Sequence, residues 1–308
     1  MGVVAAIAGG RRRRLSEPGF AVLLNAPAVL LILALVAYPL VLSFLGSLHH
    51  HQLRLNAVPR FVGLDNFVYL LGQRAFWDAL GVTATFTGAS VALTVGAAVP
   101  IALVLNEPFP GRGLVRALVL IPWAVPPVVN GLLWQWILNG KVGALNGALQ
   151  ALGVIDEYIS WVANPNPAIV MATLVFAHVW KTMPFAVIVL LAALQSIPGD
   201  LYDAARVDRA GAWQRFRHVT LPWLIHPLIV VLILETLSAF QAFDIIYVLT
   251  GGGPGTTTTT LSWLAYTTAF EYRNLGQGNA IAYVMALLQL CLALLYLFAL
   301  RGRGDVRQ

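Results

Sequence analysis

The chain is 308 residues long, with 59% hydrophobic residues, only 10% charged residues and a formal net charge of +6. Ordinary soluble domains carry roughly 25% charged residues, so this composition excludes a water-soluble globular protein. The basic residues lie between apolar blocks, which excludes a nucleic-acid-binding face and favours the Lys and Arg excess that orients membrane helices. The single cysteine, Cys291, excludes a disulfide framework, a paired-cysteine metal site and a redox motif.

The first apolar block follows a run of four arginines, as in a signal peptide. It extends from Phe20 to Leu48, which is too long for the apolar region of a signal peptide, and no small-residue cleavage pattern ends it. We therefore expect residues 1–19 to form a cytoplasmic N-terminal segment and the block itself to be an uncleaved first span.

Five further apolar blocks have about the length that crosses a bilayer, roughly 20 residues. They cover residues 79–106, 117–140, 167–197, 222–249 and 277–300. The sequence thus predicts an all-α membrane protein with six transmembrane helices in one domain, residues 20–300, followed by a short tail over 301–308. Prolines recur inside these blocks, and kinked spans are more typical of a transporter than of a simple anchor.

The basic residues also predict the orientation in the membrane. With a cytoplasmic N-terminus, thirteen of the 19 Lys and Arg residues lie in cytoplasmic segments, five lie in external segments, and Lys181 lies within a span. This bias, combined with an even number of spans, places both termini inside the cell.

Motifs for catalysis, nucleotide binding or metal binding are missing from the sequence. The glycine-rich stretch Gly251–Gly255 lacks the lysine of a phosphate-binding loop, and neither a His-Glu-x-x-His nor a Gly-x-Ser-x-Gly pattern occurs. His49, His50 and His51 have no carboxylate or cysteine at ligand spacing, so we interpret them as a polar external loop. We expect no enzyme activity and no metal site in this chain.

A polar segment with the signals of a cytoplasmic helix-turn-helix, residues 198–222, separates the fourth and fifth spans. Asp200 is a candidate N-cap with Asp203 as a capping-box-like partner, and Gly211 can end the helix. The residues at helical spacing on one narrow face are Leu201, Ala204, Ala205 and Asp208. Such a face lets another protein approach closely. Taken alone, the segment is also compatible with an interfacial helix that its arginines hold to anionic lipid.

This segment resembles the coupling loop of ATP-binding-cassette (ABC) importer permeases. The pattern of that loop is Glu-Ala-Ala, then Gly, then an aliphatic-x-Leu-Pro ending, and Asp203-Ala204-Ala205 and Val219-Thr220-Leu221-Pro222 match it. In the carbohydrate-uptake branch Asp-Gly-Ala follows the first element, and Asp208-Arg209-Ala210 stands there, with Arg209 in place of the glycine. Asp203 also replaces the usual Glu. Residues 61–67, 179–185 and 247–255 match the same branch in the right order.

The resemblance to maltose-, trehalose- and glycerol-phosphate-type permeases implies the type I ABC importer permease architecture in the plasma membrane of a bacterium or archaeon. It also implies a sugar substrate of di- or oligosaccharide size and contact with lipid. The partners that it implies are a second homologous permease, an ATPase dimer that binds ATP-Mg, and an external solute-binding protein. The residues that it assigns to ATPase coupling are Asp200, Asp203, Ala204, Ala205, Asp208, Arg209, Gly211, Leu221 and Pro222.

Charges within the spans occur only in the fourth and fifth, at Lys181, Glu235 and Asp244. Such residues are costly in a membrane and usually face a cavity or a partner. In maltose-type permeases the solute pocket lies at the middle of these two spans. That position implies the pathway residues Lys181, Thr182, Phe185, Glu235, Ser238, Ala239, Gln241 and Ala242. Asp244 is interpreted as a wetted interfacial residue, and His178 as a packed one.

The membrane charges have two alternative interpretations, a purely structural pair and an ion relay. We expect Lys181 and Glu235 to face one cavity, and the alternative is an internal pair whose role is to hold two helices together. The main rival function is an ion-coupled secondary transporter that uses Lys181, Glu235 and Asp244 as a relay. A third function is a membrane scaffold or assembly factor without transport.

Overall fold

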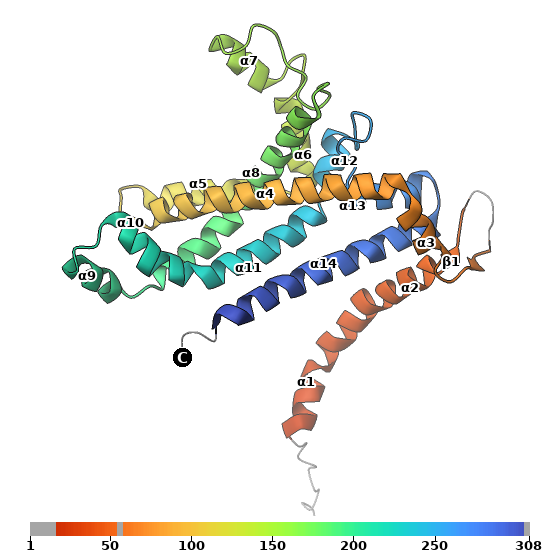
Figure 1. Ribbon diagram of the computed structural model, residues 1–308, viewed down its shortest axis with the longest axis horizontal. Helices are drawn as coiled ribbons and strands as arrows, with labels where there is room; N and C mark the ends of the chain where they lie inside the picture. Colours follow the sequence, from red (N-terminus) through yellow and green to blue (C-terminus); the bar gives the residue numbers. More distant parts are fainter. Residues whose placement is uncertain (1–16, 54–57, 305–308) are drawn as a thin grey trace, which may run out of the picture.

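The computed structural model describes residues 17–53 and 58–304, and most of them are helical (Figure 1). The basic stretch at 11–14 and residues 305–308 lie outside this part, so the cytoplasmic termini stay predictions. In the first half the elements are α1 Glu17–Ile32, the π-helical turn η1 Leu33–Ala37, α2 Tyr38–Ser47, β1 His49–His50, β2 Arg60–Phe61, α3 Asp65–Gly72, α4 Arg74–Asn106, α5 Arg112–Ala124, α6 Pro127–Ile137 and α7 Ala144–Ala151. In the second half they are α8 Pro167–Gln195, α9 Gly199–Val207, α10 Ala212–Arg215, η2 Phe216–Thr220, α11 Leu221–Phe240, α12 Asp244–Leu249, α13 Leu261–Tyr266, η3 Thr267–Glu271 and α14 Leu275–Gly304.

Among the described residues, five helical stretches are long and apolar enough to cross a membrane. They are Leu24–Ser47, Arg74–Asn106, Pro167–Gln195, Ala212–Phe240 and Leu275–Phe298. The helices α5 and α6, bent by 98° against each other, form a sixth if they are taken as one span. Each span predicted from the sequence overlaps one of these stretches, which confirms the all-α membrane architecture. The span boundaries relative to the bilayer remain predictions.

Proline causes the bend between α5 and α6. Val125 precedes Pro126 and has an extended backbone, as the residue before a proline usually does. Helix α5 therefore ends at Ala124, and α6 begins at Pro127, where a missing N–H costs nothing because it is one of the unpaired donors of a helix start. The predicted third span, residues 117–140, is thus divided.

The stretch predicted as the fifth span, residues 222–249, is divided as well. Helix α11 ends at Phe240, a short turn follows, and α12 begins at Asp244. The hydroxyl of Ser262 donates a hydrogen bond to the carbonyl oxygen of Ala242 in this turn, at 2.6 Å. Broken backbone at membrane depth is tolerated where such partners satisfy its polar groups or where it lines a cavity.

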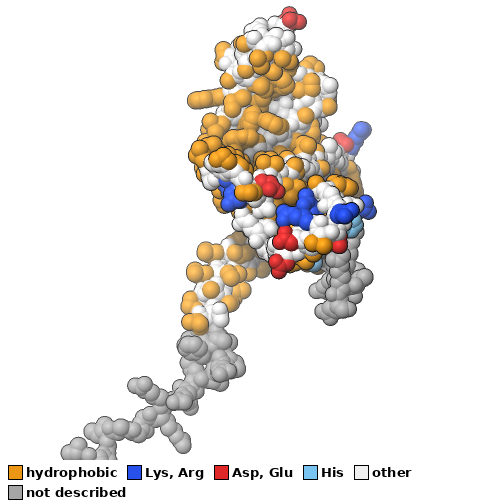
Figure 2. Space-filling model, turned by 90° about the vertical axis from the view of Figure 1, so that its left-hand side faces the viewer, with side chains coloured by type: hydrophobic (Ala, Val, Ile, Leu, Met, Phe, Trp, Pro, Cys, Tyr) orange, Lys and Arg blue, Asp and Glu red, His pale blue; other side chains and the backbone are white. Residues whose placement is uncertain are grey.

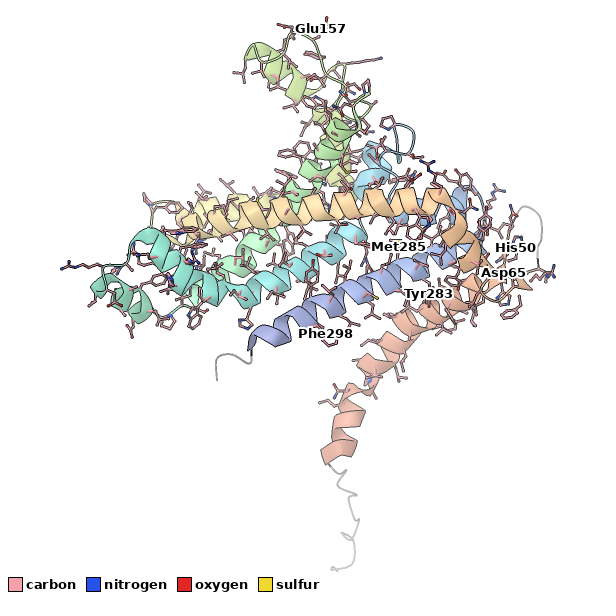
Figure 3. The ribbon with its side chains drawn as sticks, viewed as in Figure 1. His50, Asp65, Glu157, Tyr283, Met285 and Phe298 are labelled. Carbon is pink, nitrogen blue, oxygen red and sulfur yellow. The ribbon has the colours of Figure 1, made fainter. Side chains whose placement is uncertain are left out.

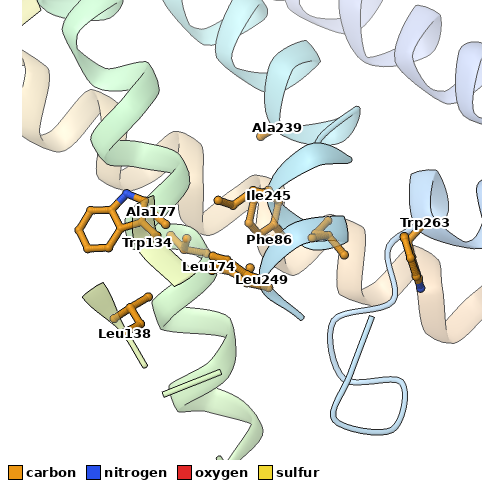
Figure 4. Packing of buried hydrophobic residues seen from close by; sticks show 11 residues of the cluster. Phe86, Trp134, Leu138, Leu174, Ala177, Ala239, Ile245, Leu249 and Trp263 are labelled. Atoms are coloured by element: carbon orange, nitrogen blue, oxygen red, sulfur yellow. The ribbon is translucent and has the colours of Figure 1, made fainter. Parts of the chain in front are cut away.

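Helices α4, α8 and α11 pack together at the centre of the molecule (Figure 1). The buried face of α4 consists mostly of small or hydroxyl-bearing residues: Phe76, Ala79, Thr83, Phe86, Thr87, Ser90, Thr94, Ala98, Ala102 and Leu105. Small residues let helices approach closely in a membrane. Helix α4 meets α8 in two buried clusters, one around Phe86 and Ala177 (Figure 4) and one around Ala98 and Leu190.

The first apolar stretch, α1 to α2, diverges from this body (Figure 1). Its contact with the rest is made by α2, where the Tyr283 hydroxyl donates to the Leu40 carbonyl and Ser43 donates to Asn279 at 3.1 Å. None of the residues in its apolar window is buried. The α7 segment projects from another part of the molecule, with Glu157 at its tip, while His50 and Asp65 lie at the end opposite α9 (Figure 3).

Candidate functional site

A cavity of about 160 Å³ lies where the two broken stretches meet α8. Its wall is formed by α6, α8, the end of α11, the turn after it and the start of α12. The lining residues are Pro127, Asn130, His178, Lys181, Thr182, Ser238, Gln241, Ala242, Phe243, Asp244 and Ile245. Asn130 fixes α6 to α8 because its amide donates to the carbonyl oxygen of Ala177, at 3.4 Å. The cavity is therefore built from the breaks that the prolines and the turn impose.

Five of the predicted pathway residues line this cavity: Lys181, Thr182, Ser238, Gln241 and Ala242. The other three lie elsewhere. Phe185 stacks on Trp123 with ring centroids 6.0 Å apart, and Ala239 is packed in the buried cluster around Phe86. Glu235 is only 4% exposed and lies against Thr182, behind the wall. Their assignment to the cavity surface is wrong for this conformation, because the helical stripe alone cannot show which neighbour covers it.

The charge that shares the cavity with Lys181 is Asp244, not Glu235. Lys181 and Asp244 interact electrostatically across the cavity, without a direct ion pair. Within residues 17–53 and 58–304 the direct ion pairs are Arg74 with Asp78 and Arg206 with Asp203. The expectation that Lys181 and Glu235 face the same cavity is thus corrected. Asp244 lines the cavity because the break after Phe240 turns it to the wall, and its position relative to the membrane interface stays a prediction.

Two buried polar atoms at the cavity have no hydrogen-bond partner among the residues that the structure describes. They are the Asn130 Oδ1 and the His178 Nε2 atoms. Buried polar groups are nearly always hydrogen-bonded in native proteins, so such a group points to a partner from outside the chain. Asn130 was missed by the sequence reasoning, although an amide inside an apolar block is itself a signal of a polar path.

An aromatic group extends from the cavity wall along α12 and α13. Phe243 lines the cavity and lies 4.9 Å from Tyr266 and 5.5 Å from Tyr247, measured between ring centroids. Trp263 packs among these rings, and Phe270 continues the group beyond Tyr266. Flat aromatic faces next to hydroxyl and amide groups are typical of pockets that bind an amphipathic small molecule.

The predicted cytoplasmic segment forms a helix-turn-helix of α9, α10 and η2, where charged side chains gather on the surface (Figure 2). The helix start differs from the prediction. Pro198 is the N-cap of α9 and makes no side-chain cap bond, so Asp200 only stands in the first turn. Asp203 does not cap either, because it pairs with Arg206 at 2.6 Å. Gly211 caps the next helix, α10, with its N–H donating to Gln214 at 2.7 Å.

The two faces of α9 border different hollows. The predicted narrow face, with Leu201, Ala204, Ala205 and Asp208, lines a groove of about 400 Å³ against α10 and η2. The opposite face, with Tyr202 and Asp203, borders a larger hollow of about 1070 Å³ next to the end of α4. Tyr202 is fixed there by a 2.9 Å hydrogen bond between its hydroxyl and that of Thr220, just before Leu221 and Pro222 begin α11.

Arg209 stands in the turn that ends α9, with φ of +54°. Its N–H donates to the carbonyl of Arg206, and the N–H of Ala210 donates to that of Ala205, the pattern of a Schellman motif. That motif favours glycine at the left-handed position, because a Cβ there is costly. The departure of Arg209 from the glycine of the coupling-loop pattern thus has a structural cost.

Replacing Arg209 with Gly should stabilise the chain by about 0.5 to 1 kcal/mol. The substitution removes the cost of a left-handed Cβ in the folded state, and this gain is larger than the free energy lost because glycine makes the unfolded chain more flexible. Thermal unfolding of the purified protein measures it. Arg209→Ala keeps the Cβ and should bring no gain. A loss of stability in Arg209→Gly would contradict the structural role assigned to this position.

Comparison with known proteins identifies the family. Residues 90–302 match the model described as "Binding-protein-dependent transport system inner membrane component". The chain belongs to this family of ABC importer permeases. The trehalose/maltose transport system permease protein MalF of Thermococcus litoralis is 43% identical over 92% of this chain and 94% of its own length. The trehalose transport system permease protein SugA of Mycobacterium tuberculosis is 38% identical over 87% of this chain and 84% of its own length.

Solved structures show the same permease fold. A chain of a bacterial ABC transporter involved in the import of alginate, an acidic polysaccharide, matches with a TM-score of 0.77, 24% identity and coverage of 92% of this permease and 95% of that chain. A second structure, of the alginate transporter in complex with a periplasmic protein that carries an alginate pentasaccharide, matches with a TM-score of 0.75. The type I importer architecture expected from the sequence is thereby confirmed.

Proposed function

We propose that this permease carries an uncharged saccharide of di- or oligosaccharide size across the plasma membrane of a bacterium or archaeon. The observation that supports this most is the cavity, whose wall offers hydroxyl, amide and aromatic groups with buried polar atoms left unpaired. Hydroxyls of a polyol can satisfy such atoms, while aromatic faces contact its C–H groups. The trehalose names of two similar permeases agree with this substrate class.

The importer in this proposal contains a second homologous permease, an ATPase dimer that binds ATP-Mg and an external protein that delivers the saccharide. The α9 face that borders the groove contacts the ATPase, and Asp203, Arg209, Gly211, Leu221 and Pro222 set the shape of the loop around it. ATP binding closes the ATPase dimer and moves both coupling loops, and the attached spans then change the side from which the cavity is open. Both termini of this permease lie in the cytoplasm.

An ion-coupled transporter is the weaker candidate. Such a mechanism would need a chain of ionisable groups, and Glu235, one of the three groups expected to form it, is covered behind Thr182 and does not line the cavity. Membership of an ABC importer family also favours ATP as the energy source.

Solute protection of a cysteine at Ser238 tests the proposed position of the pathway. Ser238 is exposed at the cavity wall, so a Ser238→Cys variant made in a Cys291→Ser background should react with a small thiol reagent. At a saccharide concentration about ten times its Kd, bound solute should slow this reaction about tenfold. Glu157→Cys, at the tip of the α7 segment, is the control and should react at an unchanged rate. Equal rates at Ser238→Cys with and without a transported saccharide would contradict the pathway.

A further inference from the structure

The cavity wall carries two opposite charges, Lys181 from α8 and Asp244 from the start of α12. We propose that these two residues set the charge selectivity of the pathway, so that Lys181 and Asp244 together favour an uncharged saccharide and Asp244 keeps acidic saccharides out. This inference rests on the proposed saccharide pathway and adds the residues that decide between neutral and acidic substrates.

The rest of the wall is uncharged or covered. Asn130, Thr182, Ser238 and Gln241 contribute amide and hydroxyl groups. His178 is buried, with its ring 5.2 Å from that of Phe86, measured between centroids. The nearby carboxyl of Glu235 lies behind Thr182 and does not line the cavity. A solute in the cavity therefore meets the charges of Lys181 and Asp244 directly, and loss of either shifts the charge at the wall by one unit.

The break after Phe240 explains why Asp244 reaches the wall. In a continuous helix Ser238, Ala242 and Ile245 would share one stripe, and Asp244 would lie well off it. The turn over residues 241–243 redirects the chain, so that Asp244 opens α12 beside Gln241 and Ala242. Gln241 is held in turn by the side chain of Gln289 on α14, at 3.3 Å. The position of Asp244 is thus a product of the turn.

Lys181 and Asp244 are not paired with each other, so both can contact a polyol. Lys181 and Asp244 interact without a direct ion pair, so the ammonium can donate to one saccharide hydroxyl while the carboxylate accepts from another. A carboxylate on the solute would be attracted by Lys181 and repelled by Asp244. At separations of several Å in a partly buried site, each of these interactions changes affinity by about tenfold or more. Removal of one charge should therefore change the preference strongly.

Binding of two matched probes tests this. The probes are maltose and the maltose derivative in which one terminal hydroxymethyl group is oxidised to a carboxylate. The Kd of each probe is measured by equilibrium binding to the complete transporter in lipid nanodiscs. The external binding protein is left out, so that any preference between the probes comes from the transporter itself. In Asp244→Asn the ratio of the Kd of the acidic probe to that of maltose should fall about tenfold or more. In Lys181→Gln it should rise by a similar factor, and in Asp156→Asn, at the exposed tip beyond α7, it should equal that of the wild type.

The outcomes distinguish a failure of the charge selectivity from a failure of the saccharide pathway. Maltose binding by the wild type combined with an unchanged ratio in Asp244→Asn would overturn the charge selectivity and leave the saccharide pathway in place. Wild-type protein that binds neither probe would overturn both. If Asp244→Asn fails to assemble, Lys181→Gln decides, because an unchanged ratio there overturns the proposal equally.

Discussion

Replacing Ala205 with Trp should abolish solute-stimulated ATP hydrolysis by the assembled transporter, or release the ATPase subunit from it. Ala205 lines the groove between α9 and the α10–η2 pair, on the face proposed to contact the ATPase. The groove has a volume of about 400 Å³, so the indole can enter it without unfolding the loop and then occupies the surface that the ATPase needs. Copurification shows whether the ATPase subunit stays bound. ATP hydrolysis measured with and without solute shows whether the bound ATPase still responds to solute.

Val207→Trp is the matched control for this change. Val207 lies two residues further along α9, is 82% exposed and does not line the groove. The same bulky side chain there should leave assembly and coupled hydrolysis close to those of the wild type. If Ala205→Trp also assembled and hydrolysed ATP in response to solute, the groove face would have no part in coupling.

Replacing Gly276 with Ala should destabilise the chain by about 3 kcal/mol, the upper part of the usual range for overpacking. Gly276 stands in the first turn of α14, and a Cβ there would come within 2.2 Å of the His49 carbonyl oxygen. The same oxygen accepts a 3.0 Å hydrogen bond from the Asn66 amide, which also donates to the Ser47 carbonyl. The neighbouring backbone is thus fixed and cannot move aside cheaply. Chemical unfolding in detergent gives the free energy of unfolding.

Gly96→Ala is the control for this prediction. Gly96 lies inside α4, and among the residues that the structure describes no packing neighbour comes within 4 Å of the position that a Cβ would occupy, so alanine should stabilise the helix by about 0.5 to 1 kcal/mol. Equal unfolding free energies for Gly276→Ala and Gly96→Ala would show that α14 does not pack against His49 as described.

The sequence was sufficient to predict the helices and the helix-turn-helix between α8 and α11 because both depend on local patterns. Apolar blocks of span length are local, and so is the spacing of Leu201, Ala204, Ala205 and Asp208 that places them along one groove. The capping of α9 was predicted wrongly, because Asp203 has a competing partner in Arg206 one turn later. Sequence spacing alone cannot rank two such local partners.

The composition of the cavity could be predicted only in part because it depends on where helices break. A continuous fifth span predicts Glu235 and Ala239 in the pathway and Asp244 outside it. The turn after Phe240 reverses the roles of Glu235 and Asp244. Asn130 reaches the cavity through the bend at Pro126, and the presence of a proline in the sequence does not give the 98° angle of that bend.

The most direct test of the proposed function is uptake of a radiolabelled neutral saccharide by proteoliposomes. These would contain this permease, its partner permease and the ATPase, with the binding protein and saccharide outside and ATP inside. We predict uptake that requires ATP and the binding protein and that continues when an uncoupler removes ion gradients. Uptake that stops with the uncoupler but continues without ATP would contradict the proposal, and so would the absence of any saccharide uptake by the complete assembly.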